Sequence, residues 1–362
     1  MKTFRCTCGN QLFFENTRCL VCGKTLGYLP DQRVHSPLVP AGDELWTSAL
    51  QGLEDRRYRK CANYTTQQVC NWMVPEDDPN PLCCSCRLSH IIPNLSQPGN
   101  LRLWHHIETA KRRLLYTLDG LGLPIEGKEV DPQHGLSFQF LESVDTSSEF
   151  TDAFSESSQV MTGHRAGTIT INLAEADPSA REHIRERMNE LYRTLLGHFR
   201  HESGHYYWYK LVESDSDRLA EFRDLFGDER QDYDEALSRY YGGGAPADWP
   251  AAYVSAYAAA HPWEDWAETW AHYLHLVDTL ETAHDHQLAL NGQSLRSLTN
   301  GIAGNEPMPD LEALLDDWRH LTTALNDLNR SMGLPDAYPF SLTGVAARKV
   351  GFVHRLIRDT GR

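Results

Sequence analysis

All nine cysteines of this 362-residue chain lie between Cys6 and Cys86, and residues 87–362 contain none. This segregation indicates a cysteine-rich N-terminal part followed by a larger part that folds without cysteine. The N-terminus lacks the apolar core of a secretory signal, so we expect a reducing, cytoplasmic location in which thiolate–metal sites are favoured over disulfides. No stretch approaches the roughly 20 apolar residues that span a bilayer, and no membrane association is expected.

The first cysteine group consists of two close pairs near the N-terminus. A glycine, Gly9 or Gly23, follows each pair directly, where a tight turn lets backbone amides face the thiolates. This arrangement is typical of a zinc ribbon, although the first pair has one intervening residue where two are usual. The predicted ligands of this structural zinc ion are Cys6, Cys8, Cys19 and Cys22. We assign residues 1–28 to the ribbon.

The second cysteine group follows a segment from about Pro30 to Asp43 whose prolines are typical of a linker. Its five thiols compete for what we interpret as one four-ligand site. Because Cys83 and Cys86 have the spacing of a metal-binding knuckle, we predict the ligands Cys61, Cys70, Cys83 and Cys86 and regard Cys84 as a neighbour. Spacing alone leaves open whether Cys84 replaces Cys83 and whether iron replaces zinc. Linker and module together span residues 29–99.

The remaining residues show helical patterns with two interruptions of strand type. Helical spacing covers residues 101–121, 311–332, 346–357 and a segment beginning near Pro262, and strand alternation covers residues 136–140 and 167–173. Asp177 followed by Pro178 indicates a helix start. An apolar stripe continues from there to His201, which predicts one long, largely buried helix.

The run His201-Glu202-Ser203-Gly204-His205 places two histidines four residues apart, so that on a helix both point the same way. Two imidazoles with this spacing can bind one zinc ion. Glu202 faces the open coordination position, where its carboxylate can take a proton from zinc-bound water. We therefore predict His201 and His205 as zinc ligands and Glu202 as the general base.

A third ligand is needed, because a hydrolytic zinc takes three protein ligands and leaves one position for water. The stretch from His261 to His272 is the best source. On a helix, Glu264, Glu268 and His272 share one face, whereas Asp265 is turned about 100° away. Spacing alone therefore leaves three candidates.

The run from Tyr257 to Glu268 resembles the gluzincin metallopeptidases, in which a second helix carries a glutamate ligand and an acid four residues later supports a zinc-bound histidine. The resemblance implies that Glu264 is the third ligand and Glu268 the supporting acid, where many gluzincins have aspartate. The run is also similar to the catalytic region of anthrax lethal factor and its relatives, where a tyrosine seven residues before the ligand faces the active site. Tyr257 holds that position.

Over nearly its whole length the chain resembles a bacterial family of zinc-binding metallopeptidases that joins a zinc-ribbon-like region to the motifs HExGHYYW and PWEDWAE. Those motifs stand here at residues 201–208 and 262–268. The resemblance implies a zincin-like metallopeptidase domain over residues 100–362. We expect an α+β fold, predominantly helical with a small sheet, preceded by the two small zinc-binding modules.

The predicted function is that of a zinc-dependent metallopeptidase, a hydrolase that cleaves peptide or protein substrates through a zinc-activated water. Glu202 would act as general base and Tyr257 would donate a hydrogen bond to the oxyanion. One catalytic and two structural Zn²⁺ ions are expected, and the ribbons would bind a protein partner or brace the catalytic domain. The alternative is a catalytically inert zincin-like scaffold or protein-binding module that works through its zinc ribbons.

The charge distribution argues against nucleic acid as the partner. The net charge is −16, with 10 Lys and Arg against 9 Asp and Glu in residues 1–100 and 24 against 41 in residues 101–362. A near-neutral N-terminal part and an acidic remainder do not provide the positive surface that binds a phosphate backbone.

Overall fold

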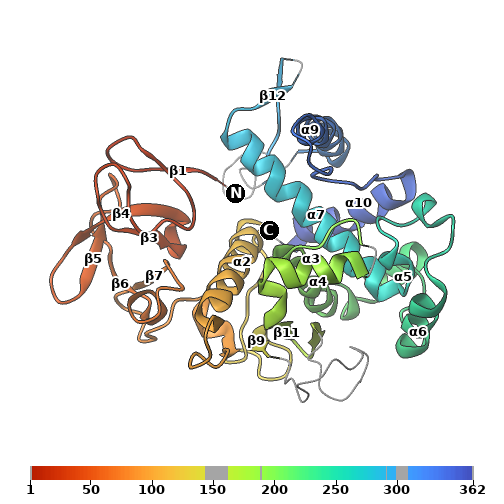
Figure 1. Ribbon diagram of the computed structural model, residues 1–362, viewed down its shortest axis with the longest axis horizontal. Coiled ribbons are helices and arrows are strands. Elements are labelled where there is room, and N and C mark those ends of the chain that lie inside the picture. Colours follow the sequence, from red (N-terminus) through yellow and green to blue (C-terminus); the bar gives the residue numbers. More distant parts are fainter. Residues whose placement is uncertain (1, 143–161, 188–189, 291, 299–308, 361–362) are drawn as a thin grey trace. The chain divides into compact units, whose positions relative to one another are not determined.

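The computed structural model describes residues 2–142, 162–187, 190–290, 292–298 and 309–360. It divides into two compact units, which we describe separately (Figure 1). The first unit comprises Met1–Tyr116 and Glu126–Ile184, and the second comprises Thr117–Ile125 and Arg185–Arg362. Within the described residues, no helix has both the length and the apolar character needed to cross a membrane.

The first unit begins with a short antiparallel hairpin and continues into a five-stranded antiparallel sheet, both in red tones in Figure 1. The hairpin strands are β1 (Phe4–Arg5) and β2 (Gln11–Leu12), and the sheet strands in spatial order are β3 (Leu26–Leu29), β4 (Val34–Pro40), β5 (Leu45–Ser48), β6 (Arg57–Lys60) and β7 (Met73–Pro75). Helix α1 (Ala62–Thr65) and the 3-10 turn η2 (Cys86–Leu88) flank β7 in sequence. The ring of Tyr28 contacts those of Phe14, Trp72 and Tyr116, which makes an aromatic core.

The segment from Pro30 to Asp43 is not the linker that its composition indicated. It contains the 3-10 turn η1 (Pro30–Gln32) and strand β4, which pairs with strands on both sides. Proline fixes φ at about −65° and lacks an N–H, so a strand tolerates it at positions where that N–H is not required for pairing. Next to Pro37, the N–H of Leu38 donates to the carbonyl of Thr25 at 2.8 Å. The predicted module boundaries at residues 28 and 99 stay a proposal.

The second sheet of the first unit has four strands, and it contains both predicted strands. In spatial order they are β10 (Gly163–Arg165), β11 (Thr168–Asn172), β9 (Ser137–Leu141) and β8 (Ser89–Ile91), with β10 antiparallel to β11 and the other pairs parallel. Helix α2 (Asn100–Gly120) contacts this sheet through Lys111. The Lys111 ammonium is fully buried, pairs with Glu108 at 2.8 Å and lies over the rings of Phe138 and Phe140.

The expectation of one long helix running from Pro178 to the histidine pair is wrong. After the 3-10 turn η3 (Leu173–Ala176), α3 (Pro178–Arg187) begins as predicted, with the Asp177 carboxylate accepting from two backbone amides, and a separate helix α4 (Leu195–Trp208) carries the histidines. Thr194 is extended and its hydroxyl accepts from the N–H of Gly197 at 3.0 Å, so it caps a new helix start. Leu191, one of the apolar residues at helical spacing between Pro178 and His201, is 60% exposed.

The second unit is almost entirely helical. After α4 it contains the π-helical turn η4 (Tyr209–Glu213), α5 (Ser216–Phe226), α6 (Tyr233–Gly243), the 3-10 turns η5 (Trp249–Ala251) and η6 (Tyr257–Ala259), α7 (Pro262–Asp285), the hairpin β12 (Ala289–Leu290) and β13 (Gln293–Ser294), α9 (Leu311–Ser331) and α10 (Gly344–Thr360). The fold is α+β, as expected.

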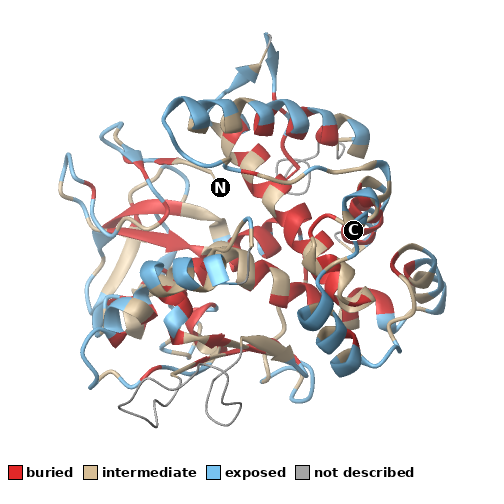
Figure 2. Cartoon of the chain, turned by 45° about the vertical axis from the view of Figure 1, so that its right-hand side comes forward, coloured by how far each residue is buried: buried red, intermediate tan, exposed pale blue. Residues whose placement is uncertain are grey.

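Helix α7, drawn in cyan in Figure 1, is the central helix of this unit and contacts α4, α5, α9 and α10. Its residues are mostly buried, whereas the outer helices have buried residues on one flank and exposed residues on the other (Figure 2). Asp265 of α7 forms a fully buried ion pair with Lys349 of α10 at 2.5 Å, and the ammonium also donates to the carbonyl of Ala252. The first turn of α7 is therefore fixed to α10.

Candidate metal centres

The structure brings His201, His205 and Glu264 together from two adjacent helices. Their ligand atoms all lie within 4.8 Å of one another. The Nε2 atom of His201 lies 3.0 Å from Oε2 of Glu264, and Nε2 of His205 lies 3.5 Å from Oε1. Two imidazole nitrogens and one carboxylate oxygen are the donor set that zinc takes in hydrolytic sites. Of the three candidates that spacing left open, Glu264 alone lies in this group.

Glu268 contacts the other side of His201. Its Oε1 atom accepts from Nδ1 of His201 at 2.7 Å, which leaves Nε2 of the same ring directed toward Glu264. Its Oε2 atom accepts from the hydroxyl of Ser255 at 2.6 Å. A carboxylate on the far nitrogen is the usual means of orienting a ligand histidine. His272 instead hydrogen-bonds through Nδ1 to the hydroxyl of Tyr338, at 2.6 Å.

Burial and neighbouring charges determine the protonation of the group. Burial lowers the pKa of His205 to about 4, so this imidazole is neutral at pH 7 and its lone pair is available. For Glu264, burial raises the pKa, but the electrostatic interaction with His205 and the hydrogen bond from His201 outweigh it and lower the pKa to about 2. Burial also lowers the pKa of His201, but the hydrogen bonds to Glu264 and Glu268 outweigh it and place that pKa well above 6.5. The carboxylates thus attract positive charge at the position of His201, which fits a cation site.

Glu202 lies beside the group, and its carboxylate accepts no hydrogen bond from the described residues. The side chain is 8% exposed. Burial raises its pKa to about 7, against the opposing charge of His201. A buried carboxylate next to a metal ligand and free of protein donors can take up a proton during a reaction.

Two tyrosines approach the group from outside the ligand helices. Tyr257, in η6, has its ring centroid 5.9 Å from that of His201. Tyr233, at the start of α6, donates its hydroxyl to Oε1 of Glu264 at 2.7 Å. The sequence gives no signal for Tyr233, because this residue lies 31 residues before Glu264 on a different helix and no spacing rule connects the two.

Gly204 allows the two ligand helices to approach closely. A Cβ atom at this position would lie 2.9 Å from Cα of Ala267 and 3.2 Å from Cβ of Trp270, both on α7. Glycine therefore stands where the backbones of α4 and α7 are in contact, one residue before a predicted ligand. The separation that places the histidines against Glu264 depends on the absence of a side chain here.

We expect Gly204→Ala to destabilise the second unit by about 1–3 kcal/mol, because a methyl group inserted at a packed contact forces the helices apart. The zinc content of the site should fall as well, since its ligands come from both helices. Thermal unfolding and zinc per chain measure the two effects. Gly242→Ala on α6 is the control, because nothing lies within 4 Å of its added Cβ. Wild-type stability and zinc content in Gly204→Ala would contradict this account.

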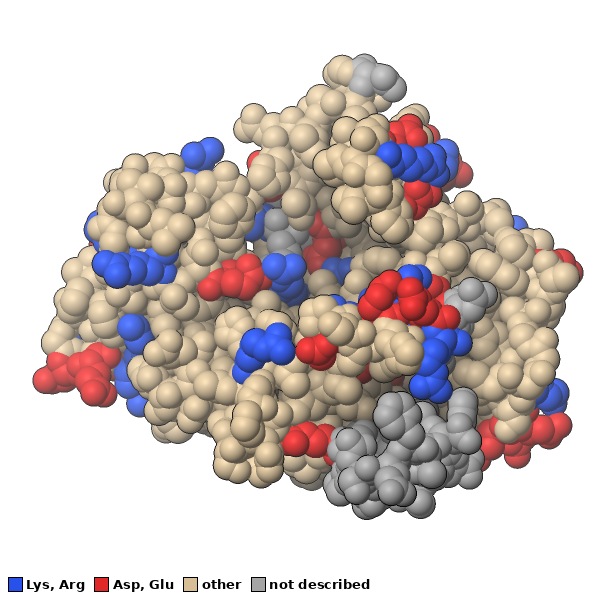
Figure 3. Space-filling model, viewed as in Figure 1, with Lys and Arg blue, Asp and Glu red and all other residues tan. Residues whose placement is uncertain are grey.

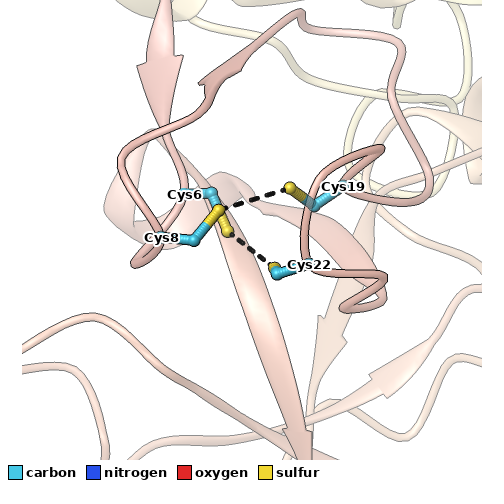
Figure 4. A group of neighbouring side chains, drawn as sticks. All are labelled: Cys6, Cys8, Cys19 and Cys22. Carbon is cyan, nitrogen blue, oxygen red and sulfur yellow. Dashed lines mark hydrogen bonds between the residues drawn. The ribbon is translucent and has the colours of Figure 1, made fainter.

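The first unit contains the two cysteine clusters, and the N-terminal one is shown in Figure 4. Sγ of Cys6 lies 3.5 Å from Sγ of Cys22, and Sγ of Cys8 lies 3.7 Å from Sγ of Cys19. The structure thus brings together the four cysteines predicted for the ribbon. Gly9 follows the first pair with a φ of +87°, a conformation that favours glycine. A hydrogen bond from the backbone of Cys22 lowers the pKa of Cys19 to about 6, which favours the thiolate that a metal needs.

The second cluster is fully buried. It consists of Cys61, Cys70, Cys83 and Cys86, each at most 2% exposed. Backbone amides point at three of the sulfurs: Trp72 N–H donates to Cys70, Cys83 N–H to Cys61 and Cys86 N–H to Cys83, at 3.3–3.4 Å. Such hydrogen bonds stabilise thiolates. Cys84 is exposed and lies outside the group.

Comparisons with known proteins give matches to two families. Residues 100–356 match a family described as "Putative zinc-binding metallo-peptidase", and residues 3–97 match one described as a zinc-ribbon domain. Uncharacterized proteins from Mycobacterium bovis and from two strains of Mycobacterium tuberculosis are each 42% identical to the chain over 361 residues, which is 99% of this chain and 96% of theirs. No solved structure gives a significant match.

Proposed function

Because the chain belongs to this family of putative zinc-binding metallo-peptidases, we propose that it is a zinc-dependent hydrolase of peptide bonds, with its catalytic centre at His201, His205 and Glu264. One observation carries the proposal. The ligand atoms of these three residues lie within 4.8 Å of one another, and the residue between the histidines is a buried glutamate with no hydrogen-bond partner in the described chain. A purely structural four-ligand site would have a fourth protein ligand in place of that free carboxylate.

The residues of the chain have separate roles in this proposal. When bound, zinc supplies the Lewis acidity that polarises the scissile carbonyl and acidifies water. Glu202 accepts the proton released by the attacking water and passes it to the leaving amine nitrogen. Glu268 holds His201 in the tautomer whose Nε2 lone pair is directed to the ion. Tyr257 donates a hydrogen bond to the oxyanion.

The two cysteine clusters are proposed to hold one structural zinc ion each, through Cys6, Cys8, Cys19 and Cys22 and through Cys61, Cys70, Cys83 and Cys86. Thiolate clusters that hold a structural zinc ion contribute their metal-binding energy to folding. The ribbons then brace the chain or bind a protein partner. On the face drawn in Figure 3, basic and acidic side chains of the described residues are interspersed, which supports a protein or peptide partner over nucleic acid.

Metal counting combined with identification of cleaved ends tests the proposal. The zinc-loaded full-length protein is incubated with a peptide mixture, and new termini are identified by mass spectrometry before and after chelator treatment. We expect three zinc ions per chain and new termini that disappear with chelator and return with added zinc. Three zinc ions per chain without any new peptide termini would overturn the proposal. That result would favour an inert zincin-like scaffold that works through its ribbons.

A further inference from the structure

The two oxygens of Glu264 have different partners. Oε1 accepts the hydroxyl of Tyr233 at 2.7 Å and lies 3.5 Å from Nε2 of His205, whereas Oε2 lies 3.0 Å from Nε2 of His201. Glu264 is 1% exposed, so no bulk water competes for either oxygen. A hydrogen bond to one oxygen of a buried carboxylate fixes its orientation and, by drawing electron density from that oxygen, leaves the other oxygen as the stronger metal ligand.

The first turn of α6, which carries Tyr233, is held against the first turn of α7 by a second, independent bond. His261 caps α7 by accepting the N–H of Trp263 at Nδ1, at 3.1 Å. Its Nε2 atom therefore carries the proton and donates to the carbonyl of Gln231 at 3.2 Å. Gln231, two residues before Tyr233, is thus hydrogen-bonded to His261, three residues before Glu264.

Ring packing holds the side chain of Tyr233 as well. The ring makes edge-to-face contacts with the ring of His261, at 5.2 Å between centroids, and with that of Trp263, at 6.1 Å. These contacts do not depend on Glu264. The hydroxyl is therefore placed by the surrounding structure, and Glu264 adopts the orientation that meets it.

We propose that Tyr233 is a positioning residue for the catalytic zinc, because it engages Oε1 of Glu264 and leaves Oε2 as the single oxygen for the ion. A carboxylate that binds through both oxygens occupies two coordination positions, and in a three-ligand hydrolytic site the second would be the position of the water. Tyr233 keeps Glu264 monodentate and orients it before the metal arrives. This inference rests on the proposed function of the site.

Tyr233→Phe tests the inference, because it keeps the ring contacts and removes the hydroxyl alone. The full-length zinc-loaded protein is titrated with a chelator, and the most weakly held zinc equivalent is followed. We expect that equivalent to bind 10–100-fold more weakly in the variant, the usual loss when a partner of a ligand is removed. In the wild-type protein, binding of this zinc equivalent should raise the Tm. The rise in Tm should be smaller in the variant, because the zinc is bound more weakly. For peptide cleavage, kcat should fall with little change in KM.

Tyr240→Phe is the matched control. It removes a tyrosine hydroxyl from the same helix and keeps the ring contact with Tyr257. Its chelator titration should match that of the wild-type protein. A zinc affinity within twofold of wild type in Tyr233→Phe would overturn the inference, including the case in which only the Tm of the metal-free protein falls. A wild-type protein without a chelator-sensitive zinc or without cleavage would instead contradict the proposed function.

Discussion

Glu202→Gln is expected to keep all its zinc and to lose peptide cleavage by about 10²–10⁴-fold, the usual contribution of a general base. Glutamine has nearly the same size and fits the same site, which is 8% exposed, so the ligands on either side should not move. Its amide has no basic oxygen that can take a proton at pH 7. Zinc per chain by elemental analysis and the rate of formation of new termini measure the two halves of the prediction.

Glu213→Gln is the control for this experiment, since it makes the same chemical change at an exposed position at the end of η4. Its zinc content and cleavage rate should match those of the wild-type protein. Undiminished cleavage by Glu202→Gln would reject the general-base role. Loss of zinc together with activity would show that Glu202 supports the metal rather than the proton transfer.

Cys83→Ser should remove one zinc ion per chain and unfold much of the first unit. Structural zinc sites contribute about 10–16 kcal/mol of apparent binding free energy to folding, and this cluster has no solvent exposure through which water could replace a thiolate. Elemental analysis gives the number and identity of the bound metals, and thermal unfolding gives the stability.

Cys84→Ser distinguishes the two possible assignments of the ligand, Cys83 or Cys84. Cys84 is exposed and outside the cluster, so its serine variant should keep the metal content and the unfolding temperature of the wild-type protein. If Cys84→Ser loses the ion and Cys83→Ser keeps it, the assignment of the fourth ligand is reversed. Equal loss in both would mean that the backbone between them, rather than one thiol, determines the site.

Helix geometry is local, so the sequence alone narrowed the third ligand to Glu264, Glu268 and His272, and the resemblance to the gluzincin metallopeptidases then implied Glu264. Once Pro262 starts a helix, every residue after it has a fixed direction, and Glu264 and Glu268 must share a face. The partner of Glu264 on its other side could not be anticipated. Tyr233 reaches it because of the path that the chain takes between α5 and α6, and this path depends on tertiary contacts such as the bond from His261 to Gln231.

The two errors in the fold have a common origin. An apolar stripe through Leu191 satisfies helical periodicity whether or not the chain is helical there, and the period does not show that Thr194 will cap a new helix. Likewise, prolines at 37 and 40 match the composition of a linker, although a strand accommodates them where their missing N–H groups are not required. In both cases a side chain–backbone or strand–strand hydrogen bond decided the structure, and composition carries no signal for it.

The buried pair of Asp265 and Lys349 has a consequence for the order in which the protein is made. The two residues are 84 positions apart, and synthesis at about 5–20 residues per second separates them by roughly 4 to 17 s. Until Lys349 has been translated, burying Asp265 would leave its charge without a partner, which is strongly unfavourable. We therefore expect the first turn of α7, and with it the proposed catalytic centre, to assemble late in synthesis.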